Sequence, residues 1–167
     1  FSDIADFTTI SEKLSPEVLS ARLSDYLRGV TRALLERRAT VDKFIGDAVM
    51  AFWGAPSPAP DHAIQACRAA LEVQRFLAKL DWPDEPRLPF LTRIGIHTGE
   101  ALVGNMGYEE RLSYTAIGDN VNFASRLEGL NKYYGTSILI SESTHAALRG
   151  ELVSRKLDLV VVKGKTH

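Results

Sequence analysis

The chain has 167 residues, of which 45% are hydrophobic and 25% are charged, a composition typical of one globular domain with a substantial core. Its 20 lysines and arginines nearly balance its 21 aspartates and glutamates, so a broad basic surface for nucleic acid or an anionic membrane is not expected. Apolar runs long enough to span a bilayer are absent, and a single cysteine excludes an internal disulfide.

Hydrophobic periodicity and turn residues predict the order of the elements. In chain order the patterns predict a short strand at the start, a helix from Ser15 to about Arg38, strands over 40–45 and 48–53, a helix over 61–80, strands over 90–97, 101–104 and 112–115, a helix over 121–133, a strand over 138–140, a short helix capped by Ser141 or Ser143, and a strand over 157–162. This order predicts an α+β fold with a ferredoxin-like βαββαβ core, in which helices pack over a mostly antiparallel sheet.

Capping residues mark the boundaries of two of these helices. Ser15 can cap the first long helix, and Pro16 fits its first turn. Asp119 or Asn120 is the simplest cap for the helix over 121–133, and Gly135 is expected to end it.

The stretch from 40 to 54 predicts two short strands that meet at the pair Gly46–Asp47. Glycine accepts the positive φ that a tight turn needs, so Asp47 is expected at the tip of a hairpin. A carboxylate held there is either a turn former or a ligand for a hard cation, and the hairpin alone leaves both open.

A second carboxylate, Asp3, lies in the first predicted strand. If that strand neighbours the hairpin, Asp3 and Asp47 converge on one point. Two carboxylates suit Mg²⁺ or Mn²⁺, which prefer oxygen ligands and leave coordination positions for water and phosphate oxygens.

Both stretches resemble the class III nucleotide cyclases, which are the catalytic domains of adenylyl and guanylyl cyclases. The matching residues are Phe1, Asp3, Ile4, Phe7 and Thr8 in the first stretch, and Lys43, Gly46, Asp47, Ala51 and Gly54 in the second. The resemblance runs over nearly the whole chain. The sequence departs from the family pattern at Asp6, where the family usually has glycine, and at Arg38–Ala39, where a pair of glycines is common.

The resemblance implies a centre with two divalent cations, Mg²⁺ or Mn²⁺, held by Asp3, Asp47 and the backbone carbonyl of Ile4. In the family, one ion lowers the pKa of the ribose 3′-hydroxyl that attacks the α-phosphate, and the other neutralises the leaving pyrophosphate. The loop that contains Phe7 and Thr8 is expected to present N–H groups to the phosphates.

The resemblance also assigns the residues that contact the base. Lys43 corresponds to a family lysine that donates a hydrogen bond to the purine base. Adenine has an acceptor at N1 and a donor at N6, whereas guanine has a donor at N1 and an acceptor at O6. Because a lysine only donates, it fits adenine. Thr115 corresponds to its partner, which is Asp or Thr in adenylyl cyclases, whereas guanylyl cyclases have Glu and Cys at these two positions. Because a hydroxyl both donates and accepts, Lys43 carries most of the preference for adenine. The threonine resembles the subgroup of bicarbonate-responsive enzymes, which makes bicarbonate a candidate regulator.

Asn122 and Arg126 are four residues apart and therefore share one face of a predicted helix, which is either a solvated face or a functional one. They match the family pair that orients the ribose and contacts charge on the α-phosphate. Lys163 matches the family lysine that holds the triphosphate, with Lys165 as an alternative.

In the family, the metal-binding aspartates come from one protomer, and the residues for base, ribose and phosphate come from the other. Because this chain carries both sets, the resemblance implies a head-to-tail homodimer with two equivalent sites. Lys43 and Asp47 would then serve opposite sites.

We therefore expect residues 1–167 to be a single adenylyl cyclase domain that converts ATP to 3′,5′-cyclic AMP and pyrophosphate. It is expected to be a cytoplasmic fragment, cut at both ends, of a longer protein with upstream regulatory domains and with or without a membrane anchor. One alternative is a guanylyl cyclase, which Lys43 and Thr115 argue against. The other is a non-catalytic nucleotide-binding or dimerisation module, which Asp6 in the phosphate loop favours.

Overall fold

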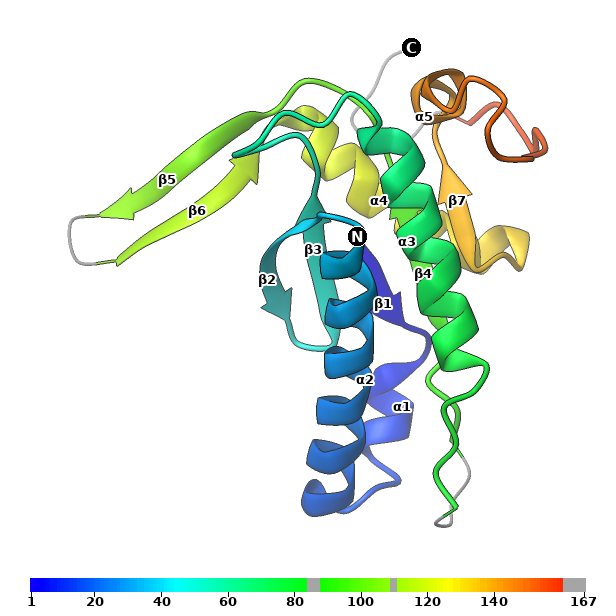
Figure 1. Cartoon of the computed structure of the whole chain (residues 1–167). Helices are drawn as coiled ribbons and strands as arrows, with labels where there is room; N and C mark the ends of the chain where they lie inside the picture. Colours follow the sequence, from blue (N-terminus) through cyan, green and yellow to red (C-terminus); the bar gives the residue numbers. More distant parts are fainter. Residues whose placement is uncertain (84–87, 109–110, 161–167) are drawn as a thin grey trace.

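The computed structural model describes residues 1–83, 88–108 and 111–160. In chain order the elements are β1 (Ser2–Ile4), α1 (Phe7–Ser11), α2 (Pro16–Glu36), β2 (Thr40–Ile45), β3 (Ala48–Phe52), α3 (His62–Leu77), β4 (Thr92–Ile96), β5 (Leu102–Tyr108), β6 (Arg111–Ile117), α4 (Asp119–Tyr134), β7 (Ile138–Ile140) and α5 (Glu142–Ala147) (Figure 1). Five strands form a sheet in the order β2-β3-β1-β4-β7, in which only the β4–β7 pair is parallel. The predicted βαββαβ core and its mostly antiparallel sheet are confirmed.

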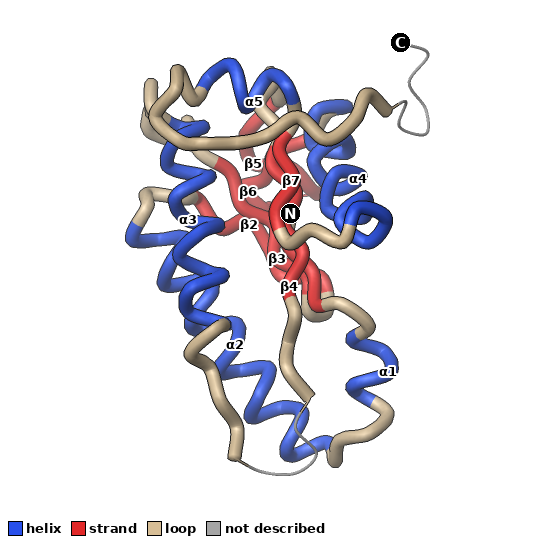
Figure 2. Tube along the Cα trace, turned by 90° about the vertical axis from the view of Figure 1, so that its right-hand side faces the viewer, coloured by secondary structure: helices blue, strands red, loops and turns tan. Residues whose placement is uncertain are grey.

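Helices cover both faces of this sheet (Figure 2). α2 and α3 contact each other on one face, and α4 packs against β4 on the other. The core lies between the sheet and the α2–α3 layer, and its fully or nearly fully buried members include Ile4, Tyr26, Val30, Leu34, Val49, Ala70, Val73 and Ile94. The buried face of α3 consists mainly of small residues, namely Ala63, Ala66, Cys67, Ala69, Ala70 and Val73.

The predicted start of α2 is confirmed, whereas the predicted cap of α4 is wrong. Pro16 is the first residue of α2, and the Ser15 hydroxyl accepts a hydrogen bond from the N–H of Val18 at 3.3 Å. α4 instead begins at Asp119 after Gly118. Asn120 lies in the first turn, and its side-chain amide donates to the carbonyl of Glu100 at 2.8 Å, which ties α4 to the loop before β5.

The last predicted strand, over 157–162, is wrong where the structure describes it. Leu157 to Val160 form no strand, and Leu159 is 84% exposed. A β-rich composition does not make a strand without a neighbour to complete the hydrogen-bond ladder. The rest of that prediction, together with Lys163 and Lys165, lies outside the described residues.

β5 and β6 form a separate two-stranded ribbon that projects from the body of the domain (Figure 1). Both strands are longer than predicted, because the ladder continues from Leu102↔Ile117 to Tyr108↔Arg111. Two glycines in β5 weaken its strand pattern, which explains the short prediction. Within the described ranges, no helix combines the length and hydrophobicity that crossing a membrane requires.

Candidate active site

The predicted pair of carboxylates forms where β1 meets the tip of the β2–β3 hairpin. β1 and β3 are neighbours, and the turn between β2 and β3 contains Gly46 with a φ of 65°, as the sequence predicted. Oδ2 of Asp47 accepts a hydrogen bond from the N–H of Ile4 at 2.9 Å. This bond anchors the tip of the hairpin on β1, directly beside Asp3.

The two carboxyl groups are close enough to share a hydrogen bond, and the pKa of Asp3 is raised to about 7. The largest cause is burial; the hydrogen bond to Asp47 and the negative charges of Asp47 and Glu128 add to it. Asp3 therefore holds a proton close to neutral pH when nothing else neutralises the negative charge around it. A divalent cation would neutralise the same oxygens, so this donor set fits a hard metal ion.

Side chains would supply only part of the coordination of a metal ion here. Among the described residues, no three His, Cys, Asp or Glu side chains gather at one point. Mg²⁺ commonly uses one or two carboxylates and completes its octahedron with water and substrate phosphates. Asp3 and Asp47 satisfy that requirement, and the carbonyl of Ile4 as a further ligand stays a prediction.

The segment predicted to lie along the triphosphate forms a turn and the short helix α1, which the sequence did not predict as a helix. Asp6 precedes it in the left-handed region, with a φ of 56°. The Phe7 ring packs against Phe90 with 6.2 Å between ring centroids, so this partly buried side chain is directed to the core. Thr8 is exposed in the first turn. Any contact of Phe7 and Thr8 with phosphate would therefore use their backbone N–H groups, and this role stays a prediction.

Lys43 and Thr115 are separated by 72 residues in the sequence, and the contact between β2 and β6 brings them together. Nζ of Lys43 donates a hydrogen bond to Oγ1 of Thr115 at 3.1 Å. Thr115 is 6% exposed, whereas the Lys43 side chain is 43% exposed. The two residues thus form one polar unit, in which the lysine side chain is partly exposed and the threonine is buried.

Asp42 is a member of this unit that the sequence analysis missed. Its side chain is fully buried, and its Oδ2 accepts hydrogen bonds from the Thr115 hydroxyl at 2.5 Å and from the N–H of Ala116 at 3.2 Å. Its Oδ1 lies 3.3 Å from Nζ of Lys43. Asp42 therefore joins β2 to β6 through both the side chain and the backbone of β6.

A β-bulge explains why Asp42 was missed. In a regular strand, consecutive side chains point to opposite faces, so Asp42 and Lys43 could not contact the same group. Here Val41 pairs with Ala51 while Lys43 pairs with Met50, which leaves Asp42 as the extra residue. A bulge changes the direction of a side chain. An acidic residue directly before a lysine, within an otherwise apolar strand, is the pattern that could have drawn attention to it.

Asn122 and Arg126 lie one turn apart on α4, as predicted. Asn122 is exposed, and Arg126 is partly buried. Nη1 of Arg126 is buried and has no hydrogen-bond partner within the ranges that the structure describes. A buried guanidinium N–H without an acceptor is costly, so this donor fits an anionic group supplied by a ligand.

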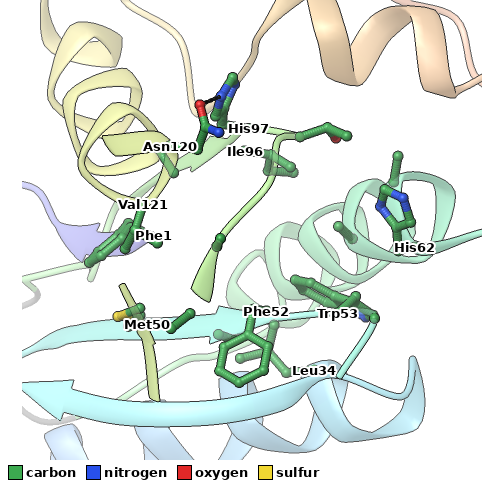
Figure 3. Close-up of a pocket in the computed structure, with 18 of the residues that line it drawn as sticks. Phe1, Leu34, Met50, Phe52, Trp53, His62, Ile96, His97, Asn120 and Val121 are labelled. Carbon is green, nitrogen blue, oxygen red and sulfur yellow. Dashed lines mark hydrogen bonds between the residues drawn. The ribbon is translucent and has the colours of Figure 1, made fainter. Parts of the chain in front are cut away.

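A cavity of about 840 Å³ lies elsewhere, between the sheet, α2, the buried face of α3 and the first turns of α4 (Figure 3). Residues of β3 and β4 line the cavity together with Phe1, which directly precedes β1. The labelled lining is mainly apolar, and at its rim Nε2 of His97 hydrogen-bonds to Oδ1 of Asn120 at 3.0 Å (Figure 3). None of the candidate site residues in the described ranges lines this cavity, so we do not assign it to the nucleotide.

Comparison with known proteins identifies the family. The family model for the adenylate and guanylate cyclase catalytic domain matches residues 1–167. Adenylate cyclase 1 of Rhizobium meliloti is 46% identical over 99% of this chain, although the chain spans only 25% of that relative. The crystal structure of the adenylyl cyclase CyaB from P. aeruginosa has a TM-score of 0.84 at 35% identity, and the match covers 99% of this chain and 86% of that one.

A guanylate cyclase is equally similar in structure. The guanylate cyclase domain of RhGC from Catenaria anguillulae, in complex with GTP, has a TM-score of 0.85 at 32% identity, covering 98% of this chain and 87% of that one. Structural similarity alone therefore does not distinguish ATP from GTP as the substrate, and the residues that would contact the base carry that distinction. Taken with the carboxylate pair, the Lys43–Thr115 unit and the α4 pair, these matches establish that the chain belongs to the family of adenylate and guanylate cyclase catalytic domains.

Proposed function

We propose that this domain is an adenylyl cyclase that converts ATP to 3′,5′-cyclic AMP and pyrophosphate. The observation that carries the choice of ATP is the contact between Lys43 and Thr115, at 3.1 Å. The ammonium group offers a donor to N1 of adenine, where guanine carries a hydrogen of its own. Guanylyl cyclase activity is the alternative, and it would need an acceptor where this chain has Lys43.

The other residues have roles that follow from their chemistry. Asp3 and Asp47, with the carbonyl of Ile4, would hold the two cations, Mg²⁺ or Mn²⁺, which lower the pKa of the attacking hydroxyl and neutralise the leaving group. The bond from the ribose 3′-oxygen to the α-phosphorus forms as the bond to the β-phosphate oxygen breaks.

Two residues of α4 and the phosphate-binding groups complete this assignment. Asn122 orients the ribose, and the unpartnered N–H of Arg126 donates to oxygens of the α-phosphate as negative charge develops. The N–H groups of Phe7 and Thr8, and the side chain of Lys163, would contact the triphosphate.

The arrangement supports a homodimer in which each site draws on both chains. The same hairpin directs Lys43 toward β6 and Asp47 toward β1. The edge strand β2 exposes Phe44 and Ile45 at 49% and 54%. The β5–β6 ribbon exposes further large apolar side chains, namely Leu102, Tyr108, Leu112, Tyr114 and Ile117. A two-stranded ribbon is marginally stable alone, and apolar patches of this kind favour association, here with a second copy.

Regulation and location complete the proposal. We place the reaction in the cytosol, because the only cysteine, Cys67, is buried and unpaired. Regulatory domains elsewhere in the protein are expected from the small share of the Rhizobium relative that this chain spans. Bicarbonate is the candidate regulator, and an activity titration with bicarbonate at constant pH tests it.

The first experiment measures cyclic nucleotide formation from ATP and from GTP with Mn²⁺ at two protein concentrations. We expect cyclic AMP from ATP, with a specific activity that rises with concentration as dimers form. Cyclic GMP as the main product would contradict the proposed substrate. Nucleotide binding without product would favour a non-catalytic module.

Mixing two inactive variants tests the shared site. Asp47→Ala and Arg126→Ala damage opposite halves, so random mixing should restore about one quarter of the wild-type activity, since half of the dimers are mixed and each has one intact site. The matched control mixes Asp47→Ala with Asp3→Ala, which damage the same half and should restore nothing. Equal recovery in both mixtures, or in neither, would argue against shared sites.

A further inference from the structure

The hydroxyl group of Thr115 has a hydrogen-bond role that its surroundings determine. A threonine hydroxyl has one hydrogen to donate and two lone pairs that accept. The contact with Asp42 is short, at 2.5 Å, and a carboxylate only accepts. The hydrogen of Thr115 is therefore donated to Asp42, and the hydroxyl presents only lone pairs to any other group.

The hydrogen-bond donors and acceptors that Thr115 and Lys43 still have free can be counted in the same way. One lone pair of Thr115 accepts from Nζ of Lys43 at 3.1 Å, which leaves one acceptor. Of the three hydrogens on Nζ, one is donated to Thr115, whereas Oδ1 of Asp42 lies 3.3 Å from Nζ as an ion-pair partner and accepts no hydrogen bond within the described ranges, so Lys43 keeps at least one free donor. The unit thus offers a donor and an acceptor side by side.

This pattern complements one purine and opposes the other. Adenine presents an acceptor at N1 and a donor at N6, which match the free donor of Lys43 and the free acceptor of Thr115. Guanine presents a donor at N1 and an acceptor at O6, which mismatch both. Without Asp42, the Thr115 hydroxyl could turn its hydrogen toward O6 and accept guanine at that position.

We propose that Asp42 is a positioning residue that makes this cyclase selective for ATP by holding the hydroxyl hydrogen of Thr115. The inference rests on the proposed function, because it assumes that the Lys43–Thr115 unit reads the base. Asp42 does not touch the nucleotide. Its complete burial, its place in the bulge and its second bond from the N–H of Ala116 keep the carboxylate in the orientation that receives the hydrogen.

The test removes the carboxylate, Asp42→Ala, because an asparagine could keep its amide oxygen at the place of Oδ2, where it would accept from both Thr115 and the N–H of Ala116. Without a side-chain acceptor at position 42, the hydroxyl hydrogen of Thr115 is free for O6 of guanine. We expect the ratio of kcat/KM for ATP to kcat/KM for GTP to fall by about tenfold or more. Because both substrates are measured on the same preparation, a lower fraction of folded protein cancels in this ratio.

Further variants separate selectivity from stability. In a Thr115→Val background, Asp42→Ala should change the ratio by less than about twofold, because the hydroxyl through which it acts is gone. Asp42→Glu keeps a group that only accepts, so its ratio should be closer to wild type than that of Asp42→Ala. Asp25→Asn removes an exposed carboxylate on α2 and should leave the ratio unchanged.

The outcomes distinguish this inference from the proposed function. A wild-type preference for ATP that survives Asp42→Ala overturns the inference and leaves the adenylyl cyclase assignment in place. A wild-type preference for GTP overturns both. Binding of 3′-deoxy-ATP and 3′-deoxy-GTP, which cannot cyclise, gives the same ratio without turnover, so the test does not depend on an active preparation.

Discussion

Gly95 in β4 determines how closely α4 approaches the sheet. A Cβ atom added at Gly95 would lie 2.2 Å from the backbone nitrogen of Glu128 and 2.5 Å from the carbonyl oxygen of Ala124. Unbonded heavy atoms normally approach to about 3.5 Å, so Gly95→Ala would push α4 away from β4 by about 1 Å. The obstacle is helix backbone, which cannot rotate aside as a side chain would.

This displacement should affect both stability and catalysis. Overpacking of this kind typically costs 1–3 kcal/mol, and we expect Gly95→Ala to lower the free energy of unfolding by about 3 kcal/mol because the obstacle is backbone. α4 also carries Asn122 and Arg126, and a shift of about 1 Å in catalytic groups can lower the rate about 100-fold. Urea unfolding and cyclic AMP formation measure the two effects.

Gly129→Ala is the matched control on the same helix. No atom lies within 4 Å of a Cβ built at Gly129, so alanine there should raise the free energy of unfolding by about 0.5–1 kcal/mol through its higher helix propensity. Opposite signs for the two variants support the packing of α4 on β4. A Gly95→Ala protein as stable as wild type would refute it.

Three other outcomes follow from single residues. The pKa of Asp3 is raised to about 7 in the folded state, so protonation of Asp3 stabilises the fold. In urea titrations without metal, the free energy of unfolding should fall by about 1–2 kcal/mol from pH 4 to pH 7, a magnitude reduced to allow for the partial exposure of Asp3. Asp3→Asn, measured in parallel, should lack this change. Arg38→Gly should raise the free energy of unfolding by about 0.5–1 kcal/mol in thermal melts, because Arg38 has a φ of 62° and its exposed ion pair with Asp61 contributes little. Arg126→Lys keeps the charge but loses the fork of donors, and should lower kcat about 100-fold with a smaller change in KM.

The parts of the fold that were predictable are those that short-range chemistry specifies. Gly46 at the turn, Ser15 at the helix start and Gly135 at the helix end each follow from the conformation that one residue can adopt. The convergence of Asp3 with Asp47 could be stated only as a condition, because strand order depends on the whole sheet. The pairing of β1 with β3 met that condition.

The residues around Thr115 show where sequence reasoning stopped. The pairing of Lys43 with Thr115 came from the family resemblance and not from spacing, since contacts across 72 residues have no local pattern. Asp42 was missed because regular alternation places it on the opposite face from Lys43, and only the bulge brings both to β6. The ambiguity of the hydroxyl, which weakened the argument for adenine, is removed by this third residue.

The two departures from the family pattern can now be judged by backbone conformation. Asp6 and Arg38 stand where the family commonly has glycine, and both have positive φ, at 56° and 62°. Arg38 follows the end of α2, a position where glycine usually ends a helix in the left-handed region. Aspartate tolerates that region better than most residues, so Asp6 preserves the conformation at the start of α1 that glycine would adopt there. Asp6 therefore loses its weight as evidence for a non-catalytic module, and the retained carboxylate pair, base-contacting unit and α4 pair favour an active cyclase.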